Sequence, residues 1–286
     1  MQSEMRLAVI ITAAGLSERF RADAERAGLG PGLSGLRSKL DEDMGGRPVL
    51  HRAVELFTNR PETARIIVAG PHDEAAMDEF RLRHADKLAV YGVTLVAGGA
   101  HHRWQTVRNA LGEIPDDGSI THVAVHDAAR PGVPELMLDR VLDAALRHPA
   151  VIPALRVHDT VKRTEEVEAE AEADPLAAIL GNGGNGDEDG GASKTETHVT
   201  ETLDRSGLRL IQTPQVFGLS LLRRAYAQED LSGTDDAQLV ERLGERVRVV
   251  AGDLRAMKIT TPGDLEALRA MLGHRSSQAR AAHKRF

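Results

Sequence analysis

The sequence predicts an α/β fold in which a mostly parallel sheet carries helices on both faces and a β-arm protrudes from it. Short apolar runs rich in Val and Ile recur between residues 7 and 154, and such runs are typical of strands buried on both faces. Helical patterns separate them at short spacing, which favours parallel strands joined by right-handed crossovers. Several runs end in glycine, alanine or a charged residue. Because ligands bind beyond the carboxyl ends of strands in such sheets, we expect a ligand site at this edge.

The first predicted strand covers residues 7–12 and ends in three small residues, Ala13, Ala14 and Gly15. Their small side chains would let backbone N–H groups approach a ligand closely. A helix that begins with the charged residues near Arg19 would direct its positive N-terminus at a phosphate. An ordinary strand-to-helix turn is the alternative, because neither of the two common phosphate-binding glycine patterns is complete here.

Residues 20–38 contain a cluster of Gly and Pro, which predicts a mobile loop that presents Arg37 and Lys39 rather than regular structure. A long loop at the carboxyl end of a strand is usually a lid or a binding loop. An insertion without a binding role is the alternative.

The next elements continue the alternation of strands and helices. We expect helices over 51–57 and 72–84 and strands over 65–70 and 93–97. The second of these strands runs into Gly98-Gly99, a turn that opens a helix carrying Arg103 and Thr106. Arg103 is either a ligand of a bound anion or an ordinary solvated residue of this helix.

The fourth predicted strand, residues 122–125, runs into the motif His126-Asp127-Ala128-Ala129-Arg130-Pro131. Asp127 is either a metal ligand or a cap for the helix expected to begin near Pro134. Arg130 could clamp a phosphate with its planar guanidinium, or form a structural ion pair with Asp127. A helix over 136–147 and a strand over 150–154 follow.

Composition excludes several classes of protein. The chain of 286 residues contains no cysteine, so it has no disulfide framework and no cysteine nucleophile, which fits a cytoplasmic protein. No apolar run approaches the ~20 residues that span a bilayer. The net charge of −7 arises largely from residues 165–191, which hold many carboxylates and no Lys or Arg. The remainder is nearly neutral, and we expect neither a nucleic-acid nor a membrane partner.

Further motifs occupy the second half of the chain. They are Asp159-Thr160-Val161-Lys162, Asp204-Arg205, Gly207-Leu208, Gln212-Thr213-Pro214-Gln215-Val216-Phe217, Thr234-Asp235-Asp236-Ala237, Met257-Lys258-Ile259-Thr260 and Asp264-Leu265. With the glycine turns and the motif at 126–131, their order resembles that of the 2-C-methyl-D-erythritol 4-phosphate cytidylyltransferase family of the non-mevalonate isoprenoid pathway. The resemblance extends from about residue 7 to 272. On the residues alone, 234–237 is most simply a helix N-cap, and Lys258 is either a site residue or a surface charge.

The resemblance implies a Rossmann-like nucleotide-diphospho-sugar transferase sheet. It also implies a reaction in which CMP passes from CTP to 2-C-methyl-D-erythritol 4-phosphate with release of pyrophosphate, a Mg²⁺ cofactor, and a homodimer that exchanges arms. Arg19, Lys39 and Lys258 would be catalytic, and Asp127 would bind the metal. The nucleotide would be bound by Ala13, Ala14, Gly15, Gly98, Gly99, Arg103, Thr106 and Ala128. The sugar phosphate would be bound by Arg130, Thr160, Arg205 and Thr213, with Arg205 and Thr213 serving the neighbouring subunit's site.

We expect a single domain over 1–273, with an arm at about 157–207 and a basic disordered tail at 274–286. The arm would contain an acidic, Gly-rich insertion at 165–191. The first part of this insertion, 165–178, could form at best a marginal solvated helix, because it has few apolar residues. The segments that flank the insertion alternate like paired strands.

The chain departs from the family pattern in three places. Ser17 stands where the family usually has a second glycine, Lys39 follows Arg19 later than usual, and residues 165–191 enlarge the arm. The delay leaves Arg37 as an alternative to Lys39 at the triphosphate. Two other functions remain open: a cytidylyltransferase for another polyol phosphate, such as ribitol 5-phosphate, and a non-catalytic nucleotide-binding relative.

The chemistry of nucleotidyl transfer fits the residues available. Such reactions depend on positioning and on charge stabilisation, so a site rich in Lys, Arg and one metal-binding carboxylate suffices. A phosphate monoester has a second pKa near 6, so its attacking oxygen is largely ionised at neutral pH without a catalytic base. The neighbours His101 and His102 do not predict a zinc site, because adjacent residues seldom share a helix face. His126 and His158 could touch substrate, but we expect them at the surface or behind the substrate-contacting residues.

Overall fold

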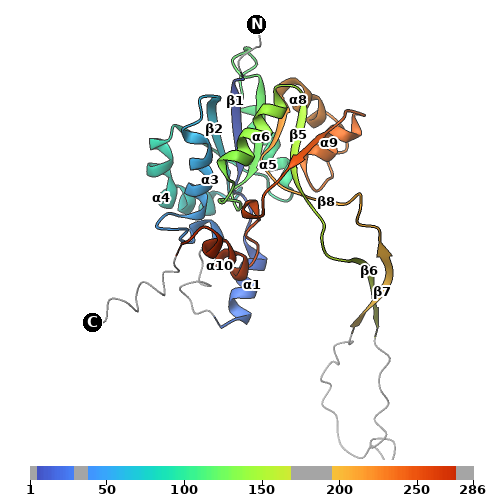
Figure 1. Cartoon of the computed structure of the whole chain (residues 1–286). Helices are drawn as coiled ribbons and strands as arrows, with labels where there is room; N and C mark the ends of the chain where they lie inside the picture. Colours follow the sequence, from blue (N-terminus) through green and yellow to red (C-terminus); the bar gives the residue numbers. More distant parts are fainter. Residues whose placement is uncertain (1–4, 29–37, 169–194, 275–286) are drawn as a thin grey trace, which may run out of the picture. The chain divides into compact units, whose positions relative to one another are not determined.

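Figure 1 shows the computed structural model of the chain. The structure describes residues 5–28, 38–168 and 195–274. The chain divides into two compact units, one of Met1–Leu155 with Ile211–Phe286 and one of Arg156–Leu210. The expectations for Arg37, for most of the insertion at 165–191 and for the tail lie outside the described residues.

The first unit is built on a mostly parallel sheet. Its strands, in chain order, are β1 (Leu7–Thr12), β2 (Thr63–Gly70), β3 (Val93–Ala97), β4 (His122–Asp127), β5 (Ala150–Arg156), β9 (Gln215–Gly218) and β10 (Arg248–Ala251). They lie side by side in the order β10-β5-β9-β4-β1-β2-β3. β1 pairs in parallel with both β2 and β4, whereas β9 runs antiparallel between β4 and β5. The chain therefore leaves β1 in one direction and returns on its other side, which creates a topological switch point at the ends of β1 and β4.

The side chains of β1 alternate between two hydrophobic clusters. Leu7, Val9 and Ile11 belong to one cluster, and Ala8 and Ile10 belong to the other. The first five residues of this strand are fully buried, as expected for a strand with helices on both sides.

Helices cover both faces of the sheet (Figure 1). One cluster includes residues of α1 (Glu18–Arg26), α3 (Val49–Thr58), α4 (Glu74–Val90), α6 (Glu135–Ala145) and α10 (Pro262–Met271). The other includes residues of α5 (Arg103–Gly112), α8 (Leu219–Tyr226) and α9 (Asp236–Arg242). Two short 3-10 helices, η1 (Lys39–Asp41) and η2 (Leu254–Ala256), lie in the connections. The predicted strands, helices and two-sided layer arrangement are confirmed.

Two local predictions were wrong. The segment 20–38 is not a loop from its start, because α1 continues to Arg26 and buries Phe20 and Ala24. The first residues of the predicted insertion are not helical, because Glu165 to Glu168 belong to a strand. A third expectation is confirmed, since Asp235 caps α9 by accepting a hydrogen bond from the Gln238 amide at 3.1 Å.

The second unit contains the hairpin of β6 (Val161–Glu168) and β7 (Thr195–Leu203). These strands pair antiparallel from Val161↔Leu203 to Glu168↔Thr195, with a register shift after Arg163. Nearly all of their side chains are exposed. β8 (Arg209–Ile211) crosses the boundary between the two units. An isolated two-stranded hairpin is at best marginally stable in water. Packing against another surface would therefore stabilise this hairpin.

Among the residues that the structure describes, no helix combines the length and apolar character needed to cross a membrane.

Candidate active site

A cavity of about 460 Å³ opens at the switch point, beside the carboxyl ends of β1 and β4 and the turn that follows β3. Its lining combines the small residues after β1, the start of α5, the carboxylate at the end of β4 and two lysines. The predicted site residues that line it are Ala13, Ala14, Gly15, Arg19, Lys39, Gly99, Arg103, Thr106, Asp127 and Lys258. Residues far apart in the sequence thus meet in one pocket because parallel strands present their carboxyl ends at the same edge.

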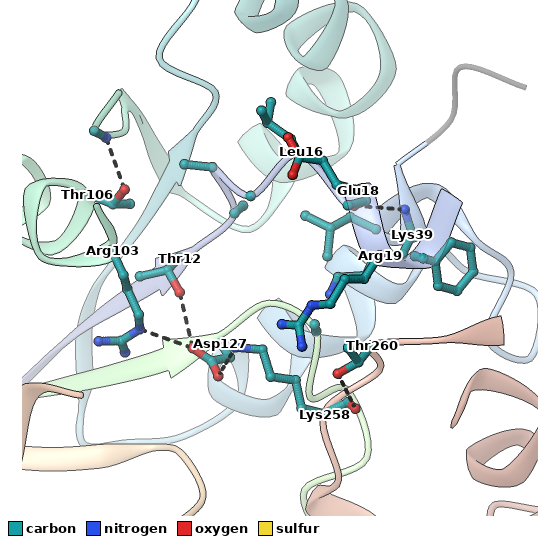
Figure 2. Close-up of a pocket in the computed structure, with 18 of the residues that line it drawn as sticks. Thr12, Leu16, Glu18, Arg19, Lys39, Arg103, Thr106, Asp127, Lys258 and Thr260 are labelled. Carbon is teal, nitrogen blue, oxygen red and sulfur yellow. Dashed lines mark hydrogen bonds and ion pairs between the residues drawn. The ribbon is translucent and has the colours of Figure 1, made fainter. Parts of the chain in front are cut away.

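Asp127 is the electrostatic centre of this cavity. Its carboxylate lies 3.0 Å from the Lys258 ammonium, 3.4 Å from the Arg130 guanidinium and 3.5 Å from that of Arg103. Burial alone would raise the pKa of Asp127, but the three cations hold this pKa far below its ordinary value. Asp127 therefore stays ionised at neutral pH. Figure 2 shows Arg19, Arg103 and Lys258 directed toward the region of Asp127 from different elements.

Asp127 does not cap a helix. α6 begins after Pro134, whose N-cap position makes no side-chain hydrogen bond. The cap interpretation is therefore wrong, because the carboxylate is engaged by Lys258, Arg103 and Arg130 instead.

A buried hydrogen-bond chain fixes the backbone around Asp127. The Asp127 amide donates to the Thr213 hydroxyl at 3.1 Å, and this hydroxyl lies 3.0 Å from Nδ1 of His126. Nε2 of His126 lies 3.2 Å from the Arg130 carbonyl oxygen, which can only accept, so Nε2 carries the proton. Burial lowers the pKa of His126 to about 4, so this ring is neutral. His126 is fully buried, so of the two expected placements the one behind the substrate-contacting residues is confirmed and the surface one is not.

The glycine turn after β3 packs against the turn after β1. A Cβ on Gly98 would come within 2.5 Å of the Ala14 Cβ and 2.6 Å of the Gly70 carbonyl oxygen. The Gly99 amide donates to the Thr106 hydroxyl at 3.0 Å. Only glycine allows these two turns to approach so closely, and this approach forms one wall of the cavity.

Arg103 is held between two carboxylates. Its guanidinium donates to Asp236 at 2.7 Å and lies 3.5 Å from Asp127. The Tyr226 hydroxyl donates to the other oxygen of Asp236 at 2.5 Å. The interpretation of Arg103 as a solvated helix residue was wrong, because it is about one quarter exposed and doubly paired.

Lys39 faces the cavity from η1, and its ammonium donates to the Ile259 carbonyl oxygen at 2.7 Å. Burial and the positive charge of Lys258 lower the pKa of Lys39 to about 8. A bound phosphate would favour the charged ammonium. Lys39 is therefore placed to bind an anion in the cavity.

The remaining predicted residues do not line the cavity. Gly98 and the buried Ala128 support its walls, and Arg130 and Thr213 lie behind Asp127. Thr160 and Arg205 belong to the second unit, where the Arg205 guanidinium donates to the His158 carbonyl oxygen. The expected assignments of these residues to substrates stay predictions.

Some lining residues were not predicted from the sequence. They are Thr12, Leu16, Ser17, Glu18, Phe20, Leu40, Ala100, His101, His102, Ala129 and Thr260. Thr12 and Ser17 could have been found, because they flank the small residues at the end of β1. For Thr260, only its position two residues after Lys258 indicated a place in the site. No cluster of three metal-ligating side chains occurs within 5–28, 38–168 and 195–274.

The fold and the cavity together define the class of the protein. Small residues, several cations and one ionised carboxylate meet at the switch point of an α/β sheet. This arrangement is suited to binding a nucleotide and stabilising charge during nucleotidyl transfer.

Comparison with known proteins defines the class more narrowly. The profile of the IspD family, described as 2-C-methyl-D-erythritol 4-phosphate cytidylyltransferase, matches residues 7–174 and 191–274. The enzyme of that name from Rhodococcus opacus is 40% identical over 248 residues, which cover 86% of this chain and 92% of the relative. The one from Frankia casuarinae is 38% identical over 257 residues, covering 90% and 82% of the two chains. The chain belongs to the 2-C-methyl-D-erythritol 4-phosphate cytidylyltransferase family and is a nucleotidyltransferase.

Solved structures agree with this assignment. A crystal structure of 4-diphosphocytidyl-2C-methyl-D-erythritol synthase from Anaerococcus prevotii superposes with a TM-score of 0.65 at 26% identity, covering 95% of this chain and all of the other. The Thermus thermophilus cytidylyltransferase gives a TM-score of 0.60 at 29% identity, covering 93% and 98% of the two chains. The family profile leaves out residues 175–190, which lie inside the predicted insertion.

Proposed function

We propose that this cavity binds CTP and that the chain uses it to transfer CMP to 2-C-methyl-D-erythritol 4-phosphate, releasing pyrophosphate. The observation that carries the proposal is the convergence of Lys258, Arg103 and the ionised Asp127 beside the small-residue turn at Ala13 to Gly15. A triphosphate brings several negative charges, and this cavity offers four cations from separate segments of the chain, Arg19, Lys39, Arg103 and Lys258.

The reaction needs charge stabilisation more than proton transfer. The phosphate oxygen of the polyol phosphate attacks the α-phosphorus of CTP, the bond to the β-phosphate bridging oxygen breaks, and pyrophosphate leaves. Lys39, Arg19 and Lys258 would stabilise the charge that develops on the α-phosphate and on the leaving group. The attacking oxygen is already ionised near neutral pH, since the second phosphate pKa is about 6.

The glycine wall would select the nucleotide base. Gly98 and Gly99 pack so closely on Ala14 and Thr106 that this side of the cavity has little freedom to widen. Fixed backbone groups on a rigid wall can accept a pyrimidine and exclude a larger purine. We therefore propose a strong preference for CTP over ATP.

The donor set at Asp127 fits a Mg²⁺ ion that is shared with the substrate. Magnesium is often bound by one or two carboxylates together with phosphate oxygens and water, and Asp127 supplies one ionised carboxylate at the cavity. Asp127 would be the residue that holds the ion. When bound, it supplies positive charge to the phosphate oxygens.

We further propose that the protein is a homodimer and that the β6–β7 hairpin is its exchanged arm. The hairpin exposes Val167 and Val199, and a two-stranded ribbon with exposed side chains gains stability when it packs on another surface. Thr160 and Arg205 belong to the same unit, and the arm would carry them to the sugar phosphate bound by the partner. The absence of cysteine agrees with a cytoplasmic location.

The test is pyrophosphate release by the purified protein. CTP with 2-C-methyl-D-erythritol 4-phosphate should give rapid release, CTP with ribitol 5-phosphate and ATP with either acceptor should give little, and excess chelator should stop the reaction. Faster turnover of ribitol 5-phosphate would assign a different polyol phosphate. Binding of CTP without turnover of either acceptor would identify a non-catalytic relative.

A further inference from the structure

We propose that Ser17 is a positioning residue for the transfer reaction. Its hydroxyl connects the turn after β1 to the turn that carries Lys39 through hydrogen bonds. These contacts position the Lys39 ammonium at the phosphate-binding part of the cavity. The inference rests on the proposed role of Lys39 in contacting CTP.

The backbone of Ser17 adopts a conformation that serine rarely takes. Its φ of 59° and ψ of 25° lie in the left-handed region. Within 5–28, 38–168 and 195–274, Ser17 is the only residue other than glycine with a positive φ. An L side chain in this region is strained, and such strain persists where the surrounding structure uses the side chain. The strain at Ser17 therefore points to an interaction of its side chain that glycine could not make.

The Ser17 side chain does not serve its own helix. Serine at the N-cap of a helix usually accepts a hydrogen bond from an amide in the first turn, but Ser17 makes no such bond to α1. The residue is also only 9% exposed, while its neighbours Leu16 and Glu18 are exposed. The hydroxyl is thus directed away from both α1 and solvent.

The hydroxyl of Ser17 instead contacts the turn at 38–41. Its oxygen lies 3.1 Å from the Ser38 hydroxyl oxygen, and the Lys39 amide donates to it at 3.4 Å. The Ser38 oxygen in turn accepts from the Leu40 amide at 3.3 Å. Accepting from an amide leaves each hydroxyl proton free, so either serine can donate to the other. This pair of hydroxyls links two segments separated by some twenty residues of chain.

The turn that carries Lys39 is anchored from its other side as well. Asp41 accepts a hydrogen bond from the Ser38 amide at 3.1 Å, which closes a capping box around η1. The other oxygen of Asp41 lies 2.7 Å from Nε2 of the buried His84, on α4. The turn is therefore clamped between α4 and Ser17, and of these two contacts only Ser17 belongs to the cavity wall.

This arrangement matters because CTP would touch both turns at once. The amides after β1 and the Lys39 ammonium must keep a fixed separation to bind adjacent phosphate oxygens. A displacement of a reacting group by about 1 Å can reduce a rate by roughly 100-fold. The Ser17–Ser38 contact sets this separation directly, and so the strained serine acts on the rate through Lys39.

The matched variants Ser17→Gly and Ser17→Ala test the inference. Glycine relieves the left-handed strain and removes the hydroxyl, whereas alanine keeps the strain and removes the hydroxyl. We expect kcat to fall about 10- to 100-fold in both, with KM for the polyol phosphate unchanged. The Tm of Ser17→Gly should equal or exceed that of the wild type, and the Tm of Ser17→Ala should be lower.

A second comparison shows whether Ser17 acts through Lys39. Each Ser17 substitution is repeated in a Lys39→Ala background, and the further loss in kcat should be less than two-fold, because the positioned group is gone. Two results would overturn the inference while leaving the proposed function intact. One is a kcat of Ser17→Ala equal to that of the wild type. The other is a Ser17 substitution that lowers kcat as much in the Lys39→Ala background as in the wild type. A wild-type protein that binds CTP but releases no pyrophosphate would instead overturn the proposed function.

Discussion

Lys39→Met should make the protein more stable and nearly inactive at the same time. The Lys39 ammonium is largely buried beside Lys258, and these surroundings lower its pKa from 10.5 to about 8. At neutral pH the folded state must therefore hold a proton that it disfavours relative to the unfolded chain. Methionine has a similar length and no charge, so it removes this unfavourable contribution to folding.

The size of the effect follows from the pKa shift. One pKa unit corresponds to about 1.4 kcal/mol, so the shift of Lys39 destabilises the folded protein by about 3 kcal/mol at pH 7. The hydrogen bond to the Ile259 carbonyl oxygen offsets about 1 kcal/mol of this. Lys39→Met should then raise the free energy of unfolding by about 2 kcal/mol, or Tm by ~4 to 8 °C.

The stability gained by Lys39→Met should depend on pH. The folded pKa of Lys39 lies below the unfolded value, so between about 8 and 10.5 the unfolded chain binds more protons than the folded one. The wild type should gain stability as pH rises through this window. The advantage of Lys39→Met should be full below pH 8 and vanish above pH 10.5.

Urea unfolding at pH 7 and pH 10, with pyrophosphate release measured at pH 7, checks both parts. Lys87→Met is the matched control, because Lys87 is an exposed residue of α4 and should give no gain. We expect kcat of Lys39→Met to fall by ~100-fold or more, as for loss of one preorganised donor. A Lys39→Met protein that is less stable than the wild type at pH 7 would refute the reasoning.

Three further predictions concern other parts of the site. Asp127→Asn leaves Lys258, Arg103 and Arg130 without their carboxylate, so it should abolish most activity and the Mg²⁺ requirement and cost roughly 3 kcal/mol. The pKa of Asp127 is lowered in the folded state, so its carboxylate stabilises the wild type at neutral pH and this contribution is lost below about pH 3.8. The difference in free energy of unfolding between Asp127→Asn and the wild type should therefore be larger at pH 7 than at pH 3, as measured by urea unfolding. Gly98→Ala places a methyl group 2.5 Å from Ala14 and should raise KM for CTP by ~10-fold or more; an unchanged KM would show that this wall yields. Replacing residues 169–194 with a short turn between Glu168 and Thr195, which are paired in the hairpin, should leave kcat and the dimer seen in sedimentation unchanged, and a monomer would mean that the replaced segment helps to build the interface.

Local patterns were enough to predict most of the sheet. Residues 7–12 form a buried strand because Val and Ile are buried on both sides, and the following Ala13, Ala14 and Gly15 line the cavity as expected. The pattern failed where two signals competed. Residues 18–26 contain helix-forming residues, with Phe20 and Ala24 spaced to face the core, but the Gly and Pro cluster downstream obscured the helix.

The antiparallel position of β9 was beyond local reasoning. Gln215–Gly218 is a strand of only four residues, too short for a clear periodic signal, and its place between β4 and β5 depends on the whole sheet order. This placement matters for the site, because it brings the Thr213 hydroxyl to the Asp127 amide.

The sequence by itself determined the class of fold, the edge of the sheet that holds the site and most residue types that line it. These features depend on burial period and on small or charged residues at strand ends, which are properties of neighbouring positions. Only the tertiary structure decided that Asp127 pairs with Lys258, that Arg103 is shared with Asp236 and that Ser17 contacts Ser38. Such contacts depend on strand order and on which side chains pack between elements, and spacing along the chain encodes neither.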